Sequence, residues 1–194
     1  MTAMLHREYP KVAILAEYFT DDRTLLRTGS LWGLNLVLAT LLGTGATGMP
    51  QGVESGESAR INFIGRKPKM EEAAEPRFAN FIARVNSILA AHPAFRRGGN
   101  CRFVDGGHPA VIAAFRQGAG TEALGFLVAC NFDTRSPQRI TIDLAPFLGT
   151  DGSISSLELL SNESQTVSYP RLELQLAPCA AQVLQLFRNG ERKT

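Results

Sequence analysis

The sequence has few cysteines and no pairing pattern among them. Its 194 residues include three, Cys101, Cys130 and Cys179, and no CxxC or Cys/His pair accompanies them. An odd number without ligand spacing argues against a disulfide framework and a zinc site, so we expect neither a metal ion nor a cofactor. All three lie among apolar residues, which predicts small buried hydrophobes and fits the reducing conditions of the cytoplasm.

Excess charge and a membrane-length apolar run are also missing. The formal net charge of +2 is too small to indicate nucleic acid as a partner, and "GRKPK" (65–69), the densest basic run, is interpreted as a solvated loop. The apolar run 31–42 is shorter than the roughly 20 residues that span a bilayer. The first residues, "MTAMLHREYPK", have no apolar core of a signal peptide. We therefore expect a cytoplasmic protein without a membrane or nucleic-acid partner.

The first half of the chain reads as alternating strand and helix. "KVAILAEYF" (11–19) is apolar on both faces, as in a buried parallel strand. "SLWGLNLVLATLLG" (30–43) predicts a helix with Ser30 as N-cap and Gly43 just past its end. "ATGMP" (46–50) is a candidate short strand, and residues 55–75 are mostly polar and predict a long loop. This order is typical of a parallel α/β layer.

The clearest helix spans residues 76–91. Pro76 stands near its first position and Pro93 follows its end. Apolar residues recur at helical spacing and form one face; they are Phe78, Phe81, Ile82, Val85, Ile88 and Leu89. We expect this face to pack against the strands that precede and follow it.

After residue 99 the apolar period changes from 3.6 to 2. Ile140, Ile142 and Leu144 alternate with polar residues, for example, and turn signals separate the runs. The predicted strands are 101–105, 110–117, 123–132, 139–144, 156–161, 165–169, 171–176 and 180–187. Short, evenly spaced strands predict an antiparallel β-sandwich or barrel. The aromatic residues of this region are expected to point mostly inward; they are Phe103, Phe115, Phe126 and Tyr169.

Four segments follow one another in a specific order: "FIARVNSILAAHPAF" (81–95), "FLVACNF" (126–132), "ELLSN" (158–162) and "LELQLAPCAAQVL" (172–184). In this order they resemble the C-terminal part of the α-amylase family of glycoside hydrolases and transglycosidases. The first is similar to the end of the family's last barrel helix, and the other three are similar to segments of its C-terminal sandwich. The resemblance implies two domains, a remnant of the last βα units of a (β/α)8 barrel at 1–97 and an antiparallel sandwich at 98–190. The expected fold class is α+β.

The same resemblance implies site residues in the first half. "GATGMPQGVE" (45–54) is similar to the family's eighth barrel strand, which places Glu54 at the barrel mouth near the sugar. "TDD" (20–22) stands where the family has a Thr-His-Asp or Asn-His-Asp motif, so Asp22 corresponds to the third catalytic carboxylate, which stabilises the transition state. Asp21 stands where the family has histidine, and it is a second candidate contact to substrate.

The nucleophile and the general acid of that family lie upstream of anything matched here. A (β/α)8 barrel takes about 250 residues, and fewer than 100 precede the predicted sandwich. Asp21 and Asp22 are adjacent, so on an extended backbone they point to opposite faces. They do not form the carboxylate pair, about 5 Å apart, that retaining glycosidases need.

The resulting interpretation is the C-terminal part of an enzyme that acts on α-glucans, inactive alone, with a sandwich that stabilises the barrel. Its partners would be an α-glucan or oligosaccharide in the intact enzyme. Exposed apolar surface on a partial barrel would favour self-association or a chain that carries the rest of the barrel. The alternative is a non-catalytic carbohydrate-binding or structural sandwich, which exposed aromatic pairs would favour.

Overall fold

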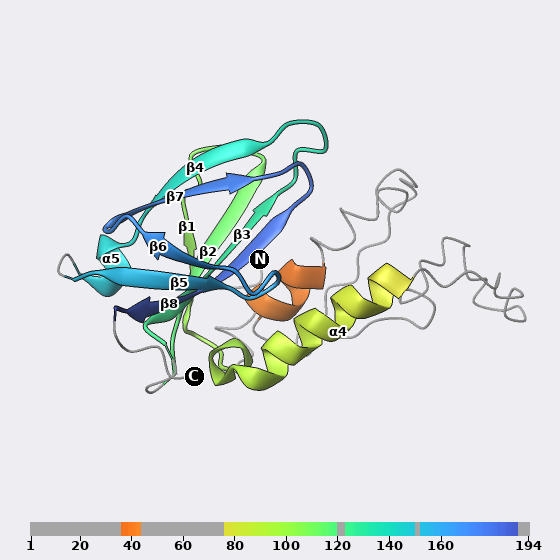
Figure 1. Ribbon diagram of the computed structural model, residues 1–194, viewed down its shortest axis with the longest axis horizontal. Helices are drawn as coiled ribbons and strands as arrows, with labels where there is room; N and C mark the ends of the chain where they lie inside the picture. The colour runs from red at the N-terminus through yellow and green to blue at the C-terminus, as the bar shows by residue number, and fades with distance from the viewer. Residues whose placement is uncertain (1–35, 44–75, 120–122, 150–151, 190–194) are drawn as a thin grey trace, which may run out of the picture.

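A computed structural model describes residues 36–43, 76–119, 123–149 and 152–189 (Figure 1). The helical elements are the π-helical turn η1 (Leu38–Leu42), α4 (Pro76–Ala91), the 3₁₀ turn η3 (Pro93–Arg96) and the short α5 (Ala145–Leu148). The strands are β1 (Cys101–Val104), β2 (Val111–Gln117), β3 (Gly125–Asn131), β4 (Gln138–Asp143), β5 (Ile154–Glu158), β6 (Ser164–Val167), β7 (Arg171–Leu176) and β8 (Ala181–Arg188).

The strands form two antiparallel sheets of unequal size. The larger has the order β1-β2-β3-β8-β5-β6, and the smaller consists of β4 and β7 alone. The chain therefore crosses from one sheet to the other between β3 and β4, and returns through α5 to β5. It makes a second excursion through β7 before β8 enters the middle of the larger sheet.

The space between the two sheets is filled by aliphatic side chains. Strict alternation on β4 and β7 turns one face of the small sheet inward, for example at Ile142 and Leu174, while Thr141 and Glu173 face solvent. The large sheet contributes Leu127, Leu184 and others from its facing side. This interior is the core of a β-sandwich, and the predicted α+β fold with an antiparallel sandwich is confirmed.

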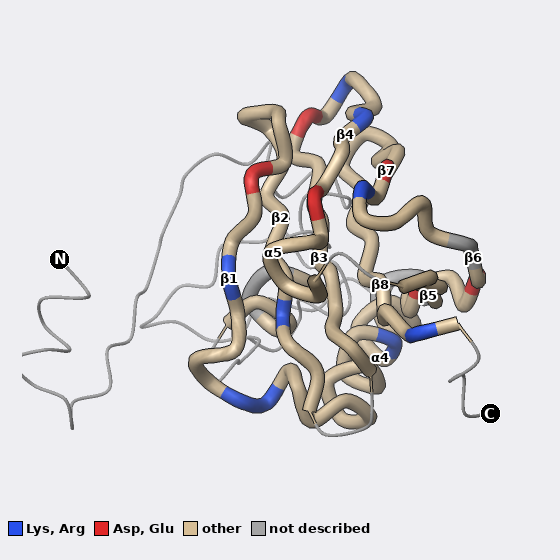
Figure 2. Tube along the Cα trace, turned by 90° about the vertical axis from the view of Figure 1, so that its left-hand side faces the viewer, with Lys and Arg blue, Asp and Glu red and all other residues tan. Residues whose placement is uncertain are grey.

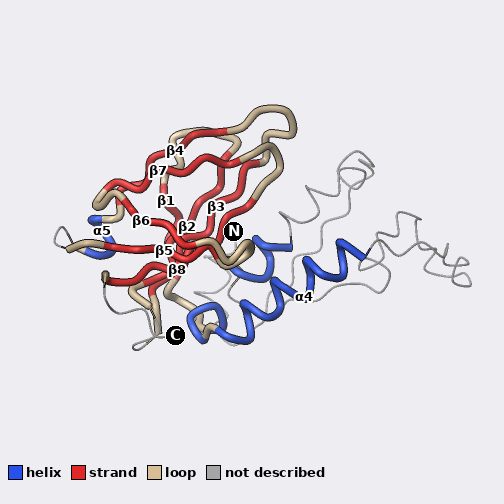
Figure 3. The backbone as a smooth tube through the Cα atoms, viewed as in Figure 1, coloured by secondary structure: helices blue, strands red, loops and turns tan. Residues whose placement is uncertain are grey.

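The other face of the large sheet is covered by helical elements. α4, η1 and η3 pack on it through a second apolar cluster, which joins Val37, Leu41, Val85 and Ile88 to Phe126 and Val128 of β3. Figure 3 shows these helices on the side of the strands opposite β4 and β7. Since β3 lies between two cores, all seven of its residues are buried, which explains why "GFLVACN" reads as apolar without alternation.

Most element predictions agree with the structure. The helix predicted at 76–91 has these bounds, and Ile82, Val85 and Ile88 of its apolar face are buried. Of the predicted helix 30–43, residues 36–43 are described, and 36–42 of these are helical. Cys130 is fully buried as expected, whereas Cys101 and Cys179 are only partly buried, and all three are free thiols.

Two predictions for the sandwich are wrong. The strand predicted at 156–161 spans Ile154–Glu158 instead, because the Glu158 carboxylate accepts a hydrogen bond from the Ser161 amide and closes a turn. Leu159 is apolar because it enters the cluster under α4. Phe103, expected to point inward, is 73% exposed on β1, since β1 is an edge strand and none of the described residues covers it there.

Charge is spread over the described part of the molecule. Figure 2 shows basic and acidic positions scattered along the trace and not gathered on one element. Among the described residues, no helix has the length and apolar character needed to cross a membrane.

Candidate functional site

The three residues predicted from the resemblance lie outside the described residues. Asp21, Asp22 and Glu54 all belong to the ranges 1–35 and 44–75, so their geometry stays a prediction. Within the described ranges, no group of three or more His, Cys, Asp or Glu side chains is placed to hold a metal ion. The candidate functional surface of the described part is therefore the helical face of the large sheet, where the two halves of the chain meet.

Arg116 is the central polar group of this face. Its side chain is fully buried on β2, because the helical layer covers that face of the sheet. Nη1 donates to the carbonyl oxygens of Ala94 at 3.2 Å and Arg97 at 2.8 Å, and to Asn100 Oδ1 at 2.7 Å. Nη2 donates to the Gly43 carbonyl at 3.0 Å. One guanidinium thus joins the end of η1, the turn after α4 and the entry to β1.

Each acceptor that Arg116 meets among the described residues is neutral. Its Nε has no hydrogen-bond partner in this part of the chain. Burial lowers the pKa of Arg116, and the nearby Cys101 opposes that shift. Burial likewise raises the pKa of the Cys101 thiol, with Arg116 acting against it. The cation also lies 5.8 Å from the centroid of the Phe95 ring, which contributes a cation–π attraction.

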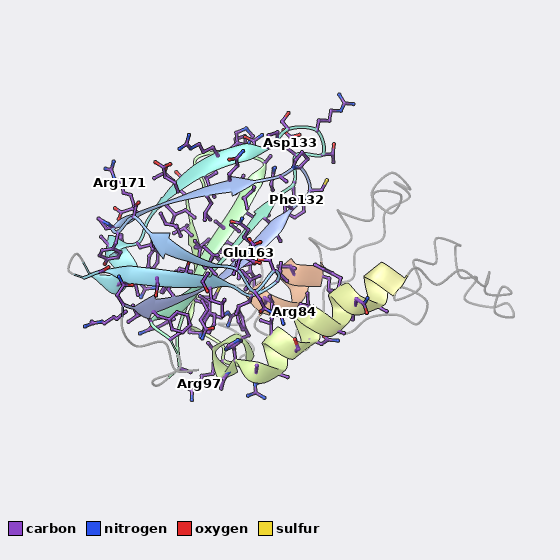
Figure 4. The ribbon with its side chains drawn as sticks, in the orientation of Figure 1. Arg84, Arg97, Phe132, Asp133, Glu163 and Arg171 are labelled. Carbon is purple, nitrogen blue, oxygen red and sulfur yellow. The ribbon has the colours of Figure 1, made fainter. Side chains whose placement is uncertain are left out.

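A second arginine fastens α4 to the sandwich. Nε of Arg84 donates to the Leu159 carbonyl at 2.6 Å, and Nη2 bonds Asn162 Oδ1. Arg84 extends from α4 toward the turn that carries Glu163 (Figure 4). The two acceptors, Leu159 and Asn162, belong to the "ELLSN" segment (158–162), which directly precedes Glu163, so this segment receives the helix in the structure.

Glu158 organises the same turn from inside. Its Oε1 accepts from the Val183 amide at 2.9 Å, and Oε2 accepts from the Ser161 amide at 2.5 Å. Both carboxylate oxygens are thereby used by the backbone. Glu158 is a structural acid in this arrangement, with no free oxygen aimed at a ligand.

Asn131 and Asp133 fix one end of the sandwich, and Asp133 lies at the end opposite α5 (Figures 1 and 4). The buried Asn131 amide donates to the carbonyls of Ser136 at 3.1 Å, Leu176 at 3.3 Å and Ala177 at 3.0 Å. The Asp133 carboxylate accepts from the amides of Arg135 and Ser136 and from Gln138 Nε2. The bond from the Arg135 amide, followed by those from Ser136 and Gln138, lowers the pKa of Asp133.

An exposed apolar patch continues the helical face toward the sheet edge. Phe103 on β1 pairs with Ala114, and Ile112 lies two residues further along β2 on the same face. Phe103 is 73% and Ile112 36% exposed. We call these two side chains the Phe103–Ile112 patch.

The described residues do not form a catalytic centre by themselves. Burial raises the pKa of Cys130 to about 12, so this thiol is no nucleophile at neutral pH. Both carboxylate oxygens of Glu158 accept hydrogen bonds from backbone amides. Asp133 lies in a loop whose hydrogen bonds lower the pKa of its carboxyl group. The arrangement can bind and position protein segments, and sequence reasoning missed its two arginines because an Arg in an alternating strand or on a helix ordinarily faces solvent.

No protein-family model matches the sequence, and no curated protein matches it either. Solved structures do match. The noncanonic maltogenic α-amylase AmyB from Thermotoga neapolitana gives a TM-score of 0.66 at 16% identity, over 95% of this chain and 44% of that one. An Anoxybacillus α-amylase gives 0.62 at 17% identity, over 83% of this chain and 33% of that one.

A third similar structure is AmyP in complex with maltose, with a TM-score of 0.57 and 18% identity over 94% of this chain and 43% of that one. At such identities the likeness establishes the fold alone. The chain spans less than half of the length of each of these three proteins.

Proposed function

We propose that this chain is the C-terminal part of an α-amylase-like glycoside hydrolase or glucanotransferase that acts on α-glucans. Residues 1–97 would be the last βα units of its catalytic barrel and residues 98–190 its C-terminal sandwich. The observation that carries the proposal is the fold match to α-amylases over 83–95% of this chain. Such a match covers a larger share of the chain than residues 98–190 make up.

The sequence segments that carry the resemblance support the same proposal. "FLVACNF" covers β3 except its first residue, "ELLSN" is the turn that receives Arg84, and "LELQLAPCAAQVL" covers β7 except its first residue and the start of β8. Each of these segments makes structural contacts in the described part of the chain. This is consistent with a domain that stabilises a neighbouring catalytic domain.

In the proposed enzyme Asp22 stabilises the transition state, and Asp21 and Glu54 contact the sugar. Since the nucleophile and the general acid belong to other barrel strands, the chain on its own has no hydrolytic activity. AmyP was solved with maltose and with maltotriose, so short α-glucans are the ligands to test.

The experiment pairs a binding assay with a turnover assay on the purified chain. Calorimetric titration with maltotriose measures affinity, and release of reducing ends from a longer maltooligosaccharide measures hydrolysis. We expect no turnover and weak binding that Asp22→Asn and Glu54→Gln reduce. Measurable turnover would contradict the absence of the catalytic pair, and binding insensitive to both substitutions would contradict the assignment of the site.

The second candidate is a non-catalytic carbohydrate-binding sandwich. Phe103 is an exposed aromatic residue in the described part, and a ring on a strand surface can stack on a sugar. Loss of binding in Phe103→Ala, with no effect of Asp22→Asn, would favour this candidate over the first.

A further inference from the structure

The edge strand β1 has open backbone groups along its outer side. β1 pairs with β2, and among the described residues no strand pairs with its other side. The Gln117 amide donates to the Asn100 carbonyl at 2.9 Å, so the backbone of residue 100 faces β2. Successive residues of a strand direct their amides and carbonyls to opposite sides. Since Phe103 follows three residues later, its amide and carbonyl point away from β2, at the open edge.

The side chain of Phe103 makes the same edge apolar. Its ring is 73% exposed, and the 36% exposed Ile112 extends the Phe103–Ile112 patch onto β2. Open backbone groups beside an exposed apolar side chain are the features through which an edge strand pairs with another strand. The occupant that satisfies the backbone of β1 and covers the ring together is therefore an extended strand.

β1 is complementary to a second copy of itself. Arg102 lies near its start and Asp105 just past its end, and both are exposed. In an antiparallel pair the basic end of one copy meets the acidic end of the other, which is favourable. A two-fold axis at Phe103 places this residue opposite its own copy, where the two outward-facing backbones exchange both hydrogen bonds. The two rings then lie on one face of the joined sheets.

We propose that β1 pairs antiparallel with β1 of a second copy across a two-fold axis at Phe103, so that the large sheet continues from one copy into the other. A contact centred on a four-residue strand is smaller than the roughly 1,200 Å² of stable complexes. The dimer is therefore reversible, and β1 is an open edge at low concentration. The inference depends on β1 alone, so the failure of this pairing and the failure of the proposed α-glucan function are separate results.

Sedimentation velocity of the 194-residue chain at concentrations from about 5 to about 500 µM tests the proposal. The sedimentation coefficient should rise with concentration toward that of a dimer. Hydrogen exchange of the peptide that contains β1 should slow by at least about threefold over the same range. Phe103→Pro should abolish both effects, because proline lacks the amide hydrogen but fits an edge position whose amide faces outward. Phe103→Leu should retain both.

A charge reversal tests the contact between the ends of the two strands. Arg102→Glu brings like charges together in the antiparallel pair and should weaken dimerisation by about fivefold. Arg139→Glu is the matched control, since Arg139 is also exposed on a strand and pairs with a carboxylate, Glu173, but lies in the small sheet. It should leave dimerisation unchanged.

Three outcomes would overturn the proposal. A chain that stays monomeric over the whole range would show that β1 does not pair with a second copy. Protection of β1 that does not depend on concentration would assign the edge to a segment of the same chain. A dimer that survives Phe103→Pro, or that Arg102→Glu and Arg139→Glu weaken equally, would place the interface elsewhere.

A cross-link provides the test if Phe103→Pro does not fold. Paired Cα atoms at the two-fold axis lie about 5.5 Å apart, a separation that a disulfide spans. The thiol oxidant diamide should therefore link Phe103→Cys into a covalent dimer, and should leave Gln175→Cys, at an exposed position of the small sheet, and the unchanged chain monomeric. Equal yields in the three proteins would contradict the pairing.

Discussion

At the scale of single residues, Arg116 joins the helical layer to the large sheet, a role that its position in the sequence does not indicate. It is an arginine near the end of strand β2, and its guanidinium donates to three backbone carbonyls and one side-chain amide oxygen. Three of these acceptors lie between residues 94 and 100, and the fourth is the distant Gly43. Its loss therefore affects the junction of the helical layer with the sheet and not one contact.

We expect Arg116→Met to lower the free energy of unfolding by about 3–4 kcal/mol, because buried carbonyls lose their donors. Urea denaturation followed by circular dichroism measures the change. Arg139→Met is the control, since Arg139 is exposed and its ion pair with Glu173 contributes about 1 kcal/mol or less. If the two substitutions lowered the free energy of unfolding equally, the assigned role of Arg116 would be contradicted.

The lowered pKa of Asp133 predicts a pH dependence. A carboxyl group with a lowered pKa stabilises the folded state above its usual pKa of 3.8, and this contribution disappears as the pH falls through the folded value. Asp133→Ala should therefore destabilise the protein at pH 7, and the difference from the unchanged chain should shrink below pH 3.8. Urea denaturation at a series of pH values measures the difference in stability between Asp133→Ala and the unchanged chain. A difference that does not change with pH would refute the role of the Asp133 carboxylate.

The residue scale is also where the sequence was least informative. The buried states of Arg116 and Asn131 depend on which carbonyls face them, and those carbonyls come from distant segments such as residues 43 and 176–177. Exposure of Phe103 depends on its being at a sheet edge, which alternation does not reveal. Asp21, Asp22 and Glu54 came from a resemblance, and their arrangement stays a prediction.

At the scale of elements, close packing of strand on strand sets what each position tolerates. Gly125 begins β3, where a Cβ would lie 2.2 Å and 2.6 Å from two atoms of the Phe115 ring. That ring cannot withdraw freely, because it stacks on Phe147 of α5 with centroids 4.6 Å apart. Position 125 therefore requires glycine, because any side chain would collide with the Phe115 ring.

Gly125→Ala should lower stability by about 1–3 kcal/mol, the usual cost of overpacking. Gly98→Ala is a suitable control, since a Cβ there meets nothing within 4 Å. Thermal denaturation of both variants measures the effect. If Gly125→Ala were as stable as Gly98→Ala, the packing of Phe115 against β3 would be wrong.

Elements were predicted well where local signals were strong. α4 has a proline at each end and one apolar face, and the alternating strands β4 and β7 have turn residues on both sides. β5 was displaced because Leu159 and Leu160 extend its apolar pattern into a turn. α5 was missed because four residues are too few to show a helical period.

At the scale of the whole molecule, the layers predict a gradient of protection. β3 is bonded to β2 on one side and β8 on the other and is covered on both faces, whereas β1 and β6 are the edges of the sheet. Within the larger sheet, we expect amides of β3 to exchange slowest and those of β1 and β6 fastest. Peptide-resolved hydrogen exchange measures this order, and a β1 as slow as β3 would contradict it.

The small sheet offers a practical consequence. Its outward side chains alternate with its buried ones and belong to neither core, so they can be replaced by anchoring groups without repacking the interior. A cysteine at one of these positions could carry a fluorescent dye or a linker to a bead, and would leave the opposite, helical side of the molecule free for measurement. The positions are Arg139, Thr141, Arg171, Glu173 and Gln175; the exposed Asp143 is left unchanged because its carboxylate accepts a hydrogen bond from the Ala145 amide.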